Sequence, residues 1–246
     1  MSESVRENLA YKTQDHSFRS RDEYANAKYD ITTDWIKPAL LGPGNLIVAN
    51  IGCGTGEYNL RLKEFGVQVL ACEPEDQAFK IASGLADGRQ VQVANMGLEE
   101  FANAHQSVGF DILVMHDVLE HIENEARAVK CVADLIKPGG QAVISVPAYQ
   151  WLFGHHDVQL GHYRRYTKSR LTEIFLPRFT ILHSRYYGSA FIPVTLMFSK
   201  WMKKSYPAEA ATSAAWKRKL FRTACQVQRH LAEPIGTSAL IHIQKR

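Results

Sequence analysis

The chain has 246 residues, of which 46% are apolar and 22% charged, as is ordinary for a globular protein. This length predicts an ample core and one large α/β domain, or a domain plus an elaboration. Its four cysteines lack metal-ligand spacing and its first residues lack an apolar signal region, which argues against a zinc site and secretion and predicts free thiols in the cytoplasm. The net charge of +4 hides a division, because residues 1–160 carry 13 Lys or Arg against 22 Asp or Glu, whereas residues 161–246 carry 16 against 3. This basic C-terminal third predicts an anionic partner.

The chain is predicted to begin with a helical cap, residues 1–44, in which Tyr24, Ala27 and Ile31 recur at helical spacing. Residues 45–148 then alternate between strands at 46–51, 68–72, 91–95, 110–116 and 140–146 and helices at 57–65, 75–87 and 118–136. Residues 149–246 add a helix at 168–176, strands at 179–187 and 237–244, and a basic helical elaboration. This order predicts a doubly wound, mostly parallel, seven-stranded Rossmann-like sheet with helices on both faces.

Three glycines, Gly52, Gly54 and Gly56, follow the first strand at alternate positions. The preceding run L-I-V-A-N-I at 46–51 has the composition of a buried parallel strand. Glycine lets the backbone adopt positive φ and approach a ligand with no Cβ in the way. Strand, glycine turn and helix start together predict a nucleotide-type site at the carboxyl edge of the sheet.

The spacing of these glycines distinguishes between nucleotides. A dinucleotide fingerprint needs its third glycine at the position of Glu57, where an anionic side chain repels a pyrophosphate. Glu57 suits a ligand that carries positive charge, such as an amino group or a sulfonium. The second strand ends at Glu73, 21 residues after Gly52, where a carboxylate can accept both hydroxyls of a ribose.

Four segments, in order and at the expected spacing, resemble the class I S-adenosylmethionine-dependent methyltransferases. They are the glycine loop at 50–56, Glu73, the run F-D-I-L-V-M-H-D-V-L-E-H-I at 110–122, and K-P-G-G-Q-A-V-I-S-V-P at 137–147. The resemblance implies an S-adenosylmethionine cofactor, with the glycine loop under its methionine part, Glu73 at the ribose, the segment after strand three near the adenine, and the backbone after strand four beside the methionine. The implied cofactor-binding residues are Asn50, Gly52, Cys53, Gly54, Gly56, Glu73, Pro74, Met96, Gly97, Leu98, His116 and Asp117.

The segment after the fifth strand, A-Y-Q-W-L-F-G-H-H-D-V-Q-L-G-H-Y-R-R-Y-T at 148–167, is called the acceptor loop here. It is rich in aromatic residues and histidine, and it leaves the sheet at the edge where ligands bind. Methyl transfer from a sulfonium is an in-line displacement that requires no metal and often needs a base, a role that a histidine beside a carboxylate can fill. Adjacent arginines can bind a carboxylate or phosphate. The predicted catalytic residues are His156, Asp157 and His162, and the predicted substrate-binding residues are Tyr149, Trp151, Tyr163, Arg164, Arg165 and Tyr166.

The string H-D-x-x-x-G-H-Y-R-R-Y-T and the stretch E-P-I-G-T-S-A-L-I are similar to a subset of these methyltransferases, many of which are thought to act on glycan, lipid-linked or secondary-metabolite acceptors. An alternative stays open for the acceptor loop. His156 with Asp157, and Arg165 with Tyr166, could instead fix the loop by internal hydrogen bonds. His121, after the fourth strand, is expected to cap and pack the next helix.

Segment 189–204 is too short and too polar to span a bilayer. It could be a lid over the acceptor site, a buried or dimer contact, or an interfacial segment on the inner face of the cytoplasmic membrane. In the interfacial alternative, the head-group layer contains Phe191, Phe198 and Trp201. The anionic lipid is bound by Lys200, Lys203 and Lys204.

These patterns predict O-methylation of a small, lipid-linked or glycan-linked biosynthetic intermediate that carries an anionic group. N- or C-methylation of a secondary metabolite or quinone-type acceptor is the alternative, and a non-catalytic cofactor-binding regulatory protein is the alternative from another class. Glu57 argues against a nicotinamide-dependent oxidoreductase. The sequence H-D-V-L at 116–119 argues against nucleic-acid methylation, which would place an N-P-P-Y-type tetrad there. The oligomeric state stays open.

Overall fold

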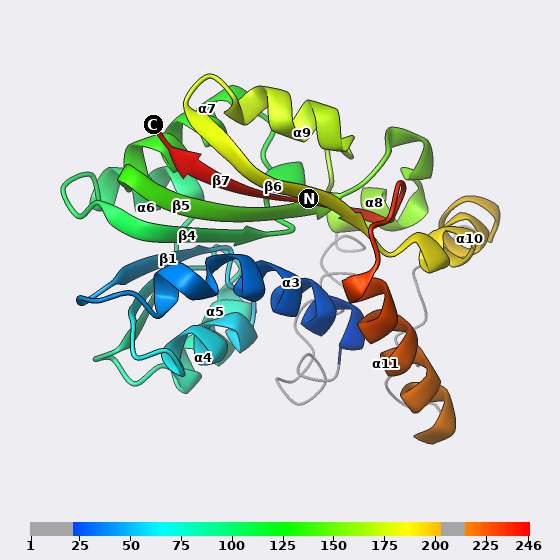
Figure 1. Cartoon of the computed structure of the whole chain (residues 1–246), viewed down its shortest axis with the longest axis horizontal. Coiled ribbons are helices and arrows are strands. Elements are labelled where there is room, and N and C mark those ends of the chain that lie inside the picture. The colour runs from blue at the N-terminus through cyan, green and yellow to red at the C-terminus, as the bar shows by residue number, and fades with distance from the viewer. Residues whose placement is uncertain (1–21, 203–214) are drawn as a thin grey trace.

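The computed structural model describes residues 22–202 and 215–246, which form a seven-stranded sheet between two layers of helices (Figure 1). The strand order is β3-β2-β1-β4-β5-β7-β6. The strands are β1 (Ile47–Ile51), β2 (Gln68–Cys72), β3 (Val91–Ala94), β4 (Phe110–His116), β5 (Ile136–Pro147), β6 (Phe179–Tyr187) and β7 (Ser238–Lys245).

Strand direction changes at one side of this sheet. β1 to β5 pair in parallel, whereas β7 runs antiparallel to both β5 and β6. The predicted Rossmann-like, mostly parallel sheet is therefore confirmed, with a mixed edge. The chain enters at β1, continues outward to β3, and returns to β4 on the other side of β1. Ligands of such sheets bind outside the carboxyl ends of the strands at this switch point.

Helices cover both faces, as predicted (Figure 1). On one face Ile36, Tyr58 and Leu62 are buried against β1, β2 and β4, and on the other Phe101 and Val132 belong to a core with β4 and β5. Burying each such side chain contributes about 1.5–3 kcal/mol. The helices of seven or more residues are α3 (Glu23–Leu40), α4 (Glu57–Lys63), α5 (Asp76–Leu85), α6 (Leu98–Ala104), α7 (Glu125–Leu135), α9 (Lys168–Phe175) and α11 (Ala215–His230). Short helical turns are η1 (Leu119–His121), η2 (Gln150–Leu152), α8 (His155–Leu160), η3 (Ser189–Phe191), α10 (Ile192–Thr195) and η4 (Leu196–Trp201).

Some elements differ from the prediction. The helix expected at 118–136 is two elements, because η1 ends at His121 and α7 starts only after Asn124, whose side chain accepts from Arg127 N at 3.1 Å. The helices α6 and α8 had no counterpart in the prediction. All four cysteines are free, as expected, and all four are buried. The division into cap, core and acceptor-side part stays a prediction, and residues 1–21 of the cap lie outside the described residues.

The carboxylate of Asp30, on α3, joins three helices that are far apart in sequence. Its Oδ1 accepts from Arg61 Nη1 of α4 at 2.7 Å. Its Oδ2 accepts from Gln226 and Arg229 of α11, at 3.3 and 3.1 Å. α3 is therefore bonded to α4 and to α11 (Figure 1).

Candidate active site

The glycine loop between β1 and α4 has the predicted conformation. Gly52, Gly54 and Gly56 have φ of 63°, 58° and 92°, the left-handed region that favours glycine. A Cβ on Gly52 would lie 2.4 Å from Cγ2 of Val118, so the loop lies directly against the segment after β4. A Cβ on Gly54 would meet no atom within 4 Å, which leaves the backbone open to a ligand there. This cradle fits a nucleoside cofactor.

Glu73, directly after β2, is held beside the glycine loop by backbone donors. Its Oε2 accepts from Gly54 N at 2.9 Å and its Oε1 accepts from Glu75 N at 3.0 Å. Each carboxylate oxygen keeps a further lone pair for a hydroxyl group. This position suits the predicted ribose contact, and the neighbouring Pro74 is exposed.

Other predicted cofactor residues also support the local fold. Asn50 Nδ2 donates to Asn59 Oδ1 at 2.7 Å, and this buried pair joins β1 to α4. Cys53 N donates to Cys72 O at 3.0 Å, and burial raises the pKa of the Cys53 thiol, which keeps it protonated. Gly97 caps α6, whose first residue Leu98 is buried in the core. Met96 lies between β3 and α6 and packs against the same core.

The end of β4 has unusual backbone geometry. Asp117 has φ of 53°, and it is one of two non-glycine residues with positive φ in the described part of the chain. Lys28 Nζ of α3 donates to Asp117 Oδ2, and Ser145 Oγ donates to Oδ1 at 3.2 Å. Burial alone would raise the pKa of Asp117, but the Lys28 ammonium lowers it below its ordinary value. The carboxylate is therefore ionised and fixed in direction.

His116 packs under the same helix. Its Nε2 lies 3.0 Å from Thr32 Oγ1, and its ring contacts Tyr29 and Tyr58 with centroids 5.0 and 4.7 Å away. Burial lowers the pKa of His116 to about 3, so the ring is neutral at physiological pH. Lys28 and Thr32 were not among the residues predicted from the sequence to bind the cofactor. The signal that could have found them is the four-residue spacing of Tyr24, Lys28 and Thr32, which places all three on one face of α3.

In the acceptor loop, Asp157 is the centre of the polar contacts. It is fully buried, and its oxygens accept from Arg165 Nε at 2.7 Å, Arg165 Nη2 at 2.9 Å and Gly154 N at 2.9 Å. Its Oδ1 also lies 2.9 Å from His162 Nδ1. Burial alone would raise the pKa of Asp157, but the bonds from His162 and Arg165 lower it to about 2. A buried carboxylate with this many donors is an ionised anchor for the loop.

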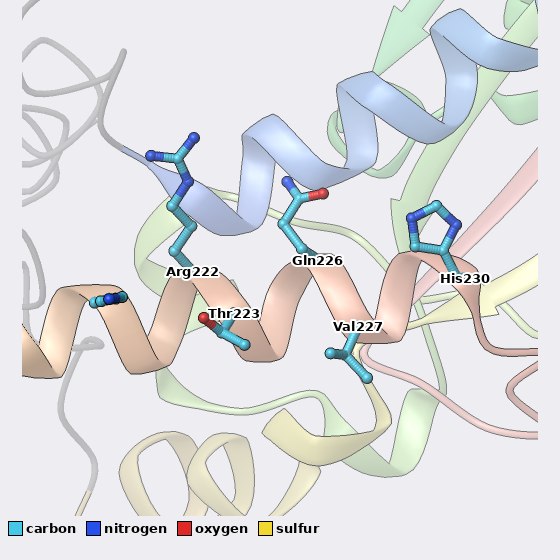
Figure 2. Close-up of a pocket in the computed structure, with 6 residues that line it drawn as sticks. Arg222, Thr223, Gln226, Val227 and His230 are labelled. Carbon is cyan, nitrogen blue, oxygen red and sulfur yellow. The ribbon is translucent and has the colours of Figure 1, made fainter.

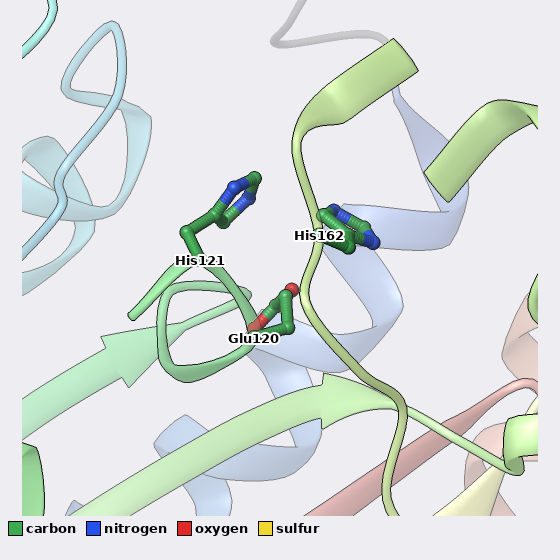
Figure 3. A group of neighbouring side chains, drawn as sticks. All are labelled: Glu120, His121 and His162. Atoms are coloured by element: carbon green, nitrogen blue, oxygen red, sulfur yellow. The ribbon is translucent and has the colours of Figure 1, made fainter. Parts of the chain in front are cut away.

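His162 faces two residues of η1 (Figure 3). Its ring meets the ring of His121 edge to face, with centroids 4.5 Å apart, and Glu120 is buried beside them. The ligand atoms of Glu120, His121 and His162 all lie within 4.8 Å of one another, so this group of described residues could hold a cation. His121, expected to cap and pack, therefore lies in the candidate site.

The other predicted histidine and the two predicted arginines make contacts within the protein. His156 is buried, and its backbone N donates to Ser199 Oγ at 3.4 Å. Arg165 donates to Asp157 within the loop, an internal bond of the kind that the alternative expected, although the alternative paired Arg165 with Tyr166 and Asp157 with His156. Arg164 donates to the backbone oxygens of Ile122 and Glu123, at 3.1 and 2.7 Å. Anion binding by either arginine stays a prediction.

Aromatic residues predicted to bind substrate lie along the acceptor loop. Tyr149 is the second non-glycine residue with positive φ, at 60°, and its ring stacks on Tyr186 with centroids 4.9 Å apart. Trp151 is 47% exposed and lies 5.5 Å from the Tyr149 ring. Tyr163 is also exposed, whereas Tyr166 is buried in the core. Asp117 and Tyr149 follow adjacent strands, so the strained backbone gathers at one edge of the sheet.

Segment 189–202 packs against the acceptor loop and α3. A Cβ on Gly154 would lie 2.3 Å from Ser199 Oγ, and the ring of Phe191 contacts Tyr24 and Phe221 at 5.4 and 5.2 Å. The predicted lipid contacts of Trp201, Lys203 and Lys204 lie outside the described side chains.

A shallow hollow lies on α11, away from the glycine loop (Figure 2). Arg222 and Gln226 point from it toward α3, where they meet Glu23 and Asp30. All the described residues that line it belong to α11, so we treat the hollow as a basic flank of this helix and not as part of the candidate site. Its residues are Lys219, Arg222, Thr223, Gln226, Val227 and His230.

Parts of this chain match known proteins in sequence. A family model described as a methyltransferase domain matches residues 22–185, about two thirds of the chain. A ubiquinone biosynthesis O-methyltransferase of Idiomarina loihiensis is 31% identical over 112 residues, which are 44% of this chain and 46% of that protein. A protein with the same name from Xylella fastidiosa is 33% identical over 100 residues, 40% of each chain. The chain spans about half the length, or less, of the curated relatives it matches.

Solved structures show the same fold at low sequence identity. The N-methyltransferase NodS of Bradyrhizobium japonicum, in complex with S-adenosylhomocysteine, has a TM-score of 0.63 and 13% identity over 99% of both chains. The [4+2]-cyclase SpnF has a TM-score of 0.56 and 18% identity over 87% of this chain and 79% of that one. With the matched family model, the glycine cradle and Glu73, these similarities identify the cofactor as S-adenosylmethionine. The chain belongs to the methyltransferase-domain family and is a class I S-adenosylmethionine-dependent methyltransferase.

Proposed function

We propose that this enzyme methylates a hydroxyl oxygen of a small or lipid-linked biosynthetic intermediate, with the Asp157–His162 pair as proton acceptor. The bond between Asp157 Oδ1 and His162 Nδ1 is the observation that carries the proposal. Hydroxyl acceptors usually have to lose a proton during methyl transfer, and a histidine oriented by a carboxylate is suited to receive it. The names of the curated relatives, O-methyltransferases of ubiquinone biosynthesis, also favour an oxygen acceptor.

The residues divide the work between binding and proton transfer. The bound cofactor supplies a methyl group on a positively charged sulfur. The glycine loop and Glu73 hold the nucleoside. The exposed aromatic rings of Trp151 and Tyr163 contact the acceptor. With Nδ1 bonded to Asp157, His162 presents Nε2 to the acceptor proton. Arg165 is a positioning residue, because it keeps Asp157 ionised and in place.

The proton-transfer role is tested with His162→Gln, which removes the base. We expect the turnover number to fall about 100-fold or more, while the affinity for S-adenosylhomocysteine stays the same. His230→Ala, an exposed histidine on α11, is the matched control and should retain full turnover. Equal turnover in His162→Gln and the parent enzyme would remove His162 from the mechanism.

The acceptor and the methylated atom are tested together. The enzyme is incubated with ¹³C-methyl-labelled cofactor and a metabolite extract of a strain that lacks it, and labelled products are found by mass spectrometry. The carbon chemical shift of the new methyl group then separates O-methylation from N- or C-methylation. A labelled N- or C-methyl product supports the alternative acceptors. No labelled product would favour a different role, as the fold shared with a cyclase illustrates.

Our second proposal is that the protein binds peripherally to a membrane, where it would meet a lipid-linked acceptor. No described helix combines the length and the apolar character needed to cross a bilayer. Val194, Met197 and Met202 are 40–45% exposed, and exposed apolar residues also lie on basic α11. Such a surface suits anionic lipid. Co-sedimentation with neutral vesicles and with vesicles containing phosphatidylglycerol should show salt-sensitive binding to the second kind alone. Binding that is the same to both, or absent, contradicts the proposal.

A further inference from the structure

The segment after β4 joins the cofactor cradle to the acceptor loop. At its start, Val118 lies directly against the glycine loop, since a Cβ on Gly52 would be 2.4 Å from Val118 Cγ2. The turn η1 follows at once, and the ring of its last residue, His121, meets the ring of His162 with centroids 4.5 Å apart (Figure 3). Residues 118–121 therefore reach from the glycine loop to the proposed proton acceptor.

Arg164 joins the acceptor loop to the same segment at a second place. Its Nη1 donates to Ile122 O at 3.1 Å, and its Nη2 donates to Glu123 O at 2.7 Å. Both carbonyl groups lie between η1 and α7, where the helix expected at 118–136 is interrupted. A continuous helix would use these oxygens for its own hydrogen bonds, so the interruption leaves them to the guanidinium.

A backbone bond close by gives these two contacts their importance. Tyr163 N donates to Glu120 O at 2.8 Å, which also joins the acceptor loop to η1. A single hydrogen bond lets the loop rotate about it, whereas the planar and rigid guanidinium of Arg164 holds two further oxygens beside it. Arg164 therefore sets the direction of the loop, and of His162 within it, relative to η1.

The structural alternative is that Arg164 only stabilises the folded loop. Other bonds already do this, because Tyr149 N donates to Tyr166 O at 2.8 Å and Arg165 donates to Asp157. Those bonds lie within the loop, whereas the bonds of Arg164 lead out of it toward the cofactor cradle. The two roles differ in what they predict for His162 when the cradle is filled.

We propose that Arg164 is a positioning residue that makes His162 follow η1 when the cofactor cradle is occupied. Because Val118 lies against the cradle, η1 takes a defined position beside a bound cofactor, and the bonds of Arg164 carry that position to the loop. His162 is thereby placed for proton removal during methyl transfer. The inference rests on the proposed function of His162, and it differs from the predicted binding of an anionic acceptor group by Arg164.

Spectra of the histidine rings test this coupling without an acceptor and without turnover. The protein is labelled with ¹⁵N-histidine, and His162→Gln identifies the His162 signals by their loss. We expect saturating S-adenosylhomocysteine to shift these signals in the parent enzyme and to leave them nearly unchanged in Arg164→Gln. The affinity of Arg164→Gln for this ligand should stay within about twofold of the parent. Arg178→Gln, at an exposed arginine after α9, is the matched control and should respond like the parent.

Methyl transfer from labelled S-adenosylmethionine to the metabolite extract separates positioning from direct binding of the acceptor. Arg164→Gln alone should lower the rate about tenfold or more. In a protein that already carries His162→Gln, the same change should lower the rate less than about twofold, because Arg164 acts through His162. An equal loss in both backgrounds overturns the proposal, and so does a shift of the His162 signals in Arg164→Gln as large as in the parent.

A second variant keeps the test valid if Arg164→Gln folds poorly. Arg164→Lys keeps the positive charge but not the planar pair of donors, so the shift of the His162 signals should again be lost. Failure of the proposed function shows differently, as full turnover in His162→Gln. The spectra need no acceptor and report the coupling in either case, so the two failures are distinguishable.

Discussion

The two halves of the candidate site, one proposed for the cofactor and one for the acceptor, are built in different ways. The cofactor half, at the ends of β1 and β2, depends on backbone conformation, with Gly52 and Gly54 in the left-handed region and Glu73 held by backbone donors. The acceptor half depends on buried charge, with Asp157 bound by Arg165 and His162. The first half should therefore be sensitive to added atoms, and the second to lost charge.

The largest expected effect is in the acceptor half. Asp157→Asn leaves the Arg165 guanidinium buried without a countercharge, and the free energy of unfolding should fall by about 3–5 kcal/mol. Urea denaturation measures this loss. Asp134→Asn is the control, because the ion pair between Asp134 and Lys130 is exposed. This variant should lower the free energy of unfolding by about 0.5 kcal/mol or less. A loss below about 1 kcal/mol for Asp157→Asn would show that buried charge does not hold this half together.

An added methyl group tests the cofactor half. Gly52→Ala places a Cβ 2.4 Å from Val118 at a position with positive φ. We expect the free energy of unfolding to fall by about 2–4 kcal/mol and S-adenosylhomocysteine binding to be abolished. Gly66 also has positive φ, at 75°, but a Cβ added there would meet no atom within 4 Å. Gly66→Ala should therefore lower the free energy of unfolding by about 1 kcal/mol and leave S-adenosylhomocysteine binding intact. Thermal melts and titrations of both variants make the comparison. Equal costs would mean that the collision with Val118 is relieved by movement of the loop.

Acid should weaken the two halves in different pH ranges. The pKa of His116 is about 3 in the fold and about 6.5 in an unfolded chain, so the unfolded chain binds more protons between these values. Its contribution to stability is complete above about pH 6.5 and falls as the pH drops below that value. The pKa of Asp157 is about 2, against about 3.9 unfolded, so its contribution is lost only below about pH 4.

Hydrogen exchange at pH 7 and pH 5, corrected for the intrinsic rates, can measure this difference. Peptides of α3, which covers His116, should lose protection equivalent to roughly 1–2 kcal/mol, while those of α8 keep theirs. His242 adds to the loss on the cofactor side, since burial lowers its pKa to about 4 and its ring stacks with Trp35 of α3. Equal loss in both helices would contradict the assignment of His116 as a buried neutral group.

The smallest expected effect on stability is at the rim of the acceptor half. Trp151→Ala removes a side chain that is 47% exposed, so the free energy of unfolding should change by about 1 kcal/mol or less. If Trp151 binds the acceptor, KM for the acceptor should rise several-fold while S-adenosylhomocysteine affinity is unchanged. Leu41→Ala, at a residue 66% exposed beyond α3, should change neither quantity. An unchanged KM in Trp151→Ala would remove it from the acceptor site.

Sequence patterns predicted the cofactor half well because its features are local. The strand, glycine turn and helix at 46–65 are contiguous, and the bounds of β2, β4 and β6 agree with the prediction. Short elements were missed where the pattern is weak. α6 has seven residues, and α8 has six within a loop rich in aromatic residues and histidine. The antiparallel direction of β7 was also not predicted, since an apolar run has the same appearance in either direction.

The side-chain contacts of the site were harder to predict because they join distant positions. The sequence paired Asp157 with its neighbour His156, whereas the structure shows a bond between Asp157 and His162, five residues further on and beyond the end of α8. His121, the last residue of η1, meets His162 of the acceptor loop, 41 residues further along the chain. Lys28 and Asp117 are separated by most of the predicted core, and no local pattern links them.

The position of β7 has a consequence for synthesis on the ribosome. β7 is made after β6 but lies between β5 and β6, and β6 pairs with β7 alone among the described strands. Until Ser238–Lys245 has emerged, a nascent chain therefore exposes the edge of β5 and an unpaired β6, both of which invite aggregation. We expect arrested chains that end before Ser238 to be cleaved rapidly at 179–187 by added protease, and longer chains to resist.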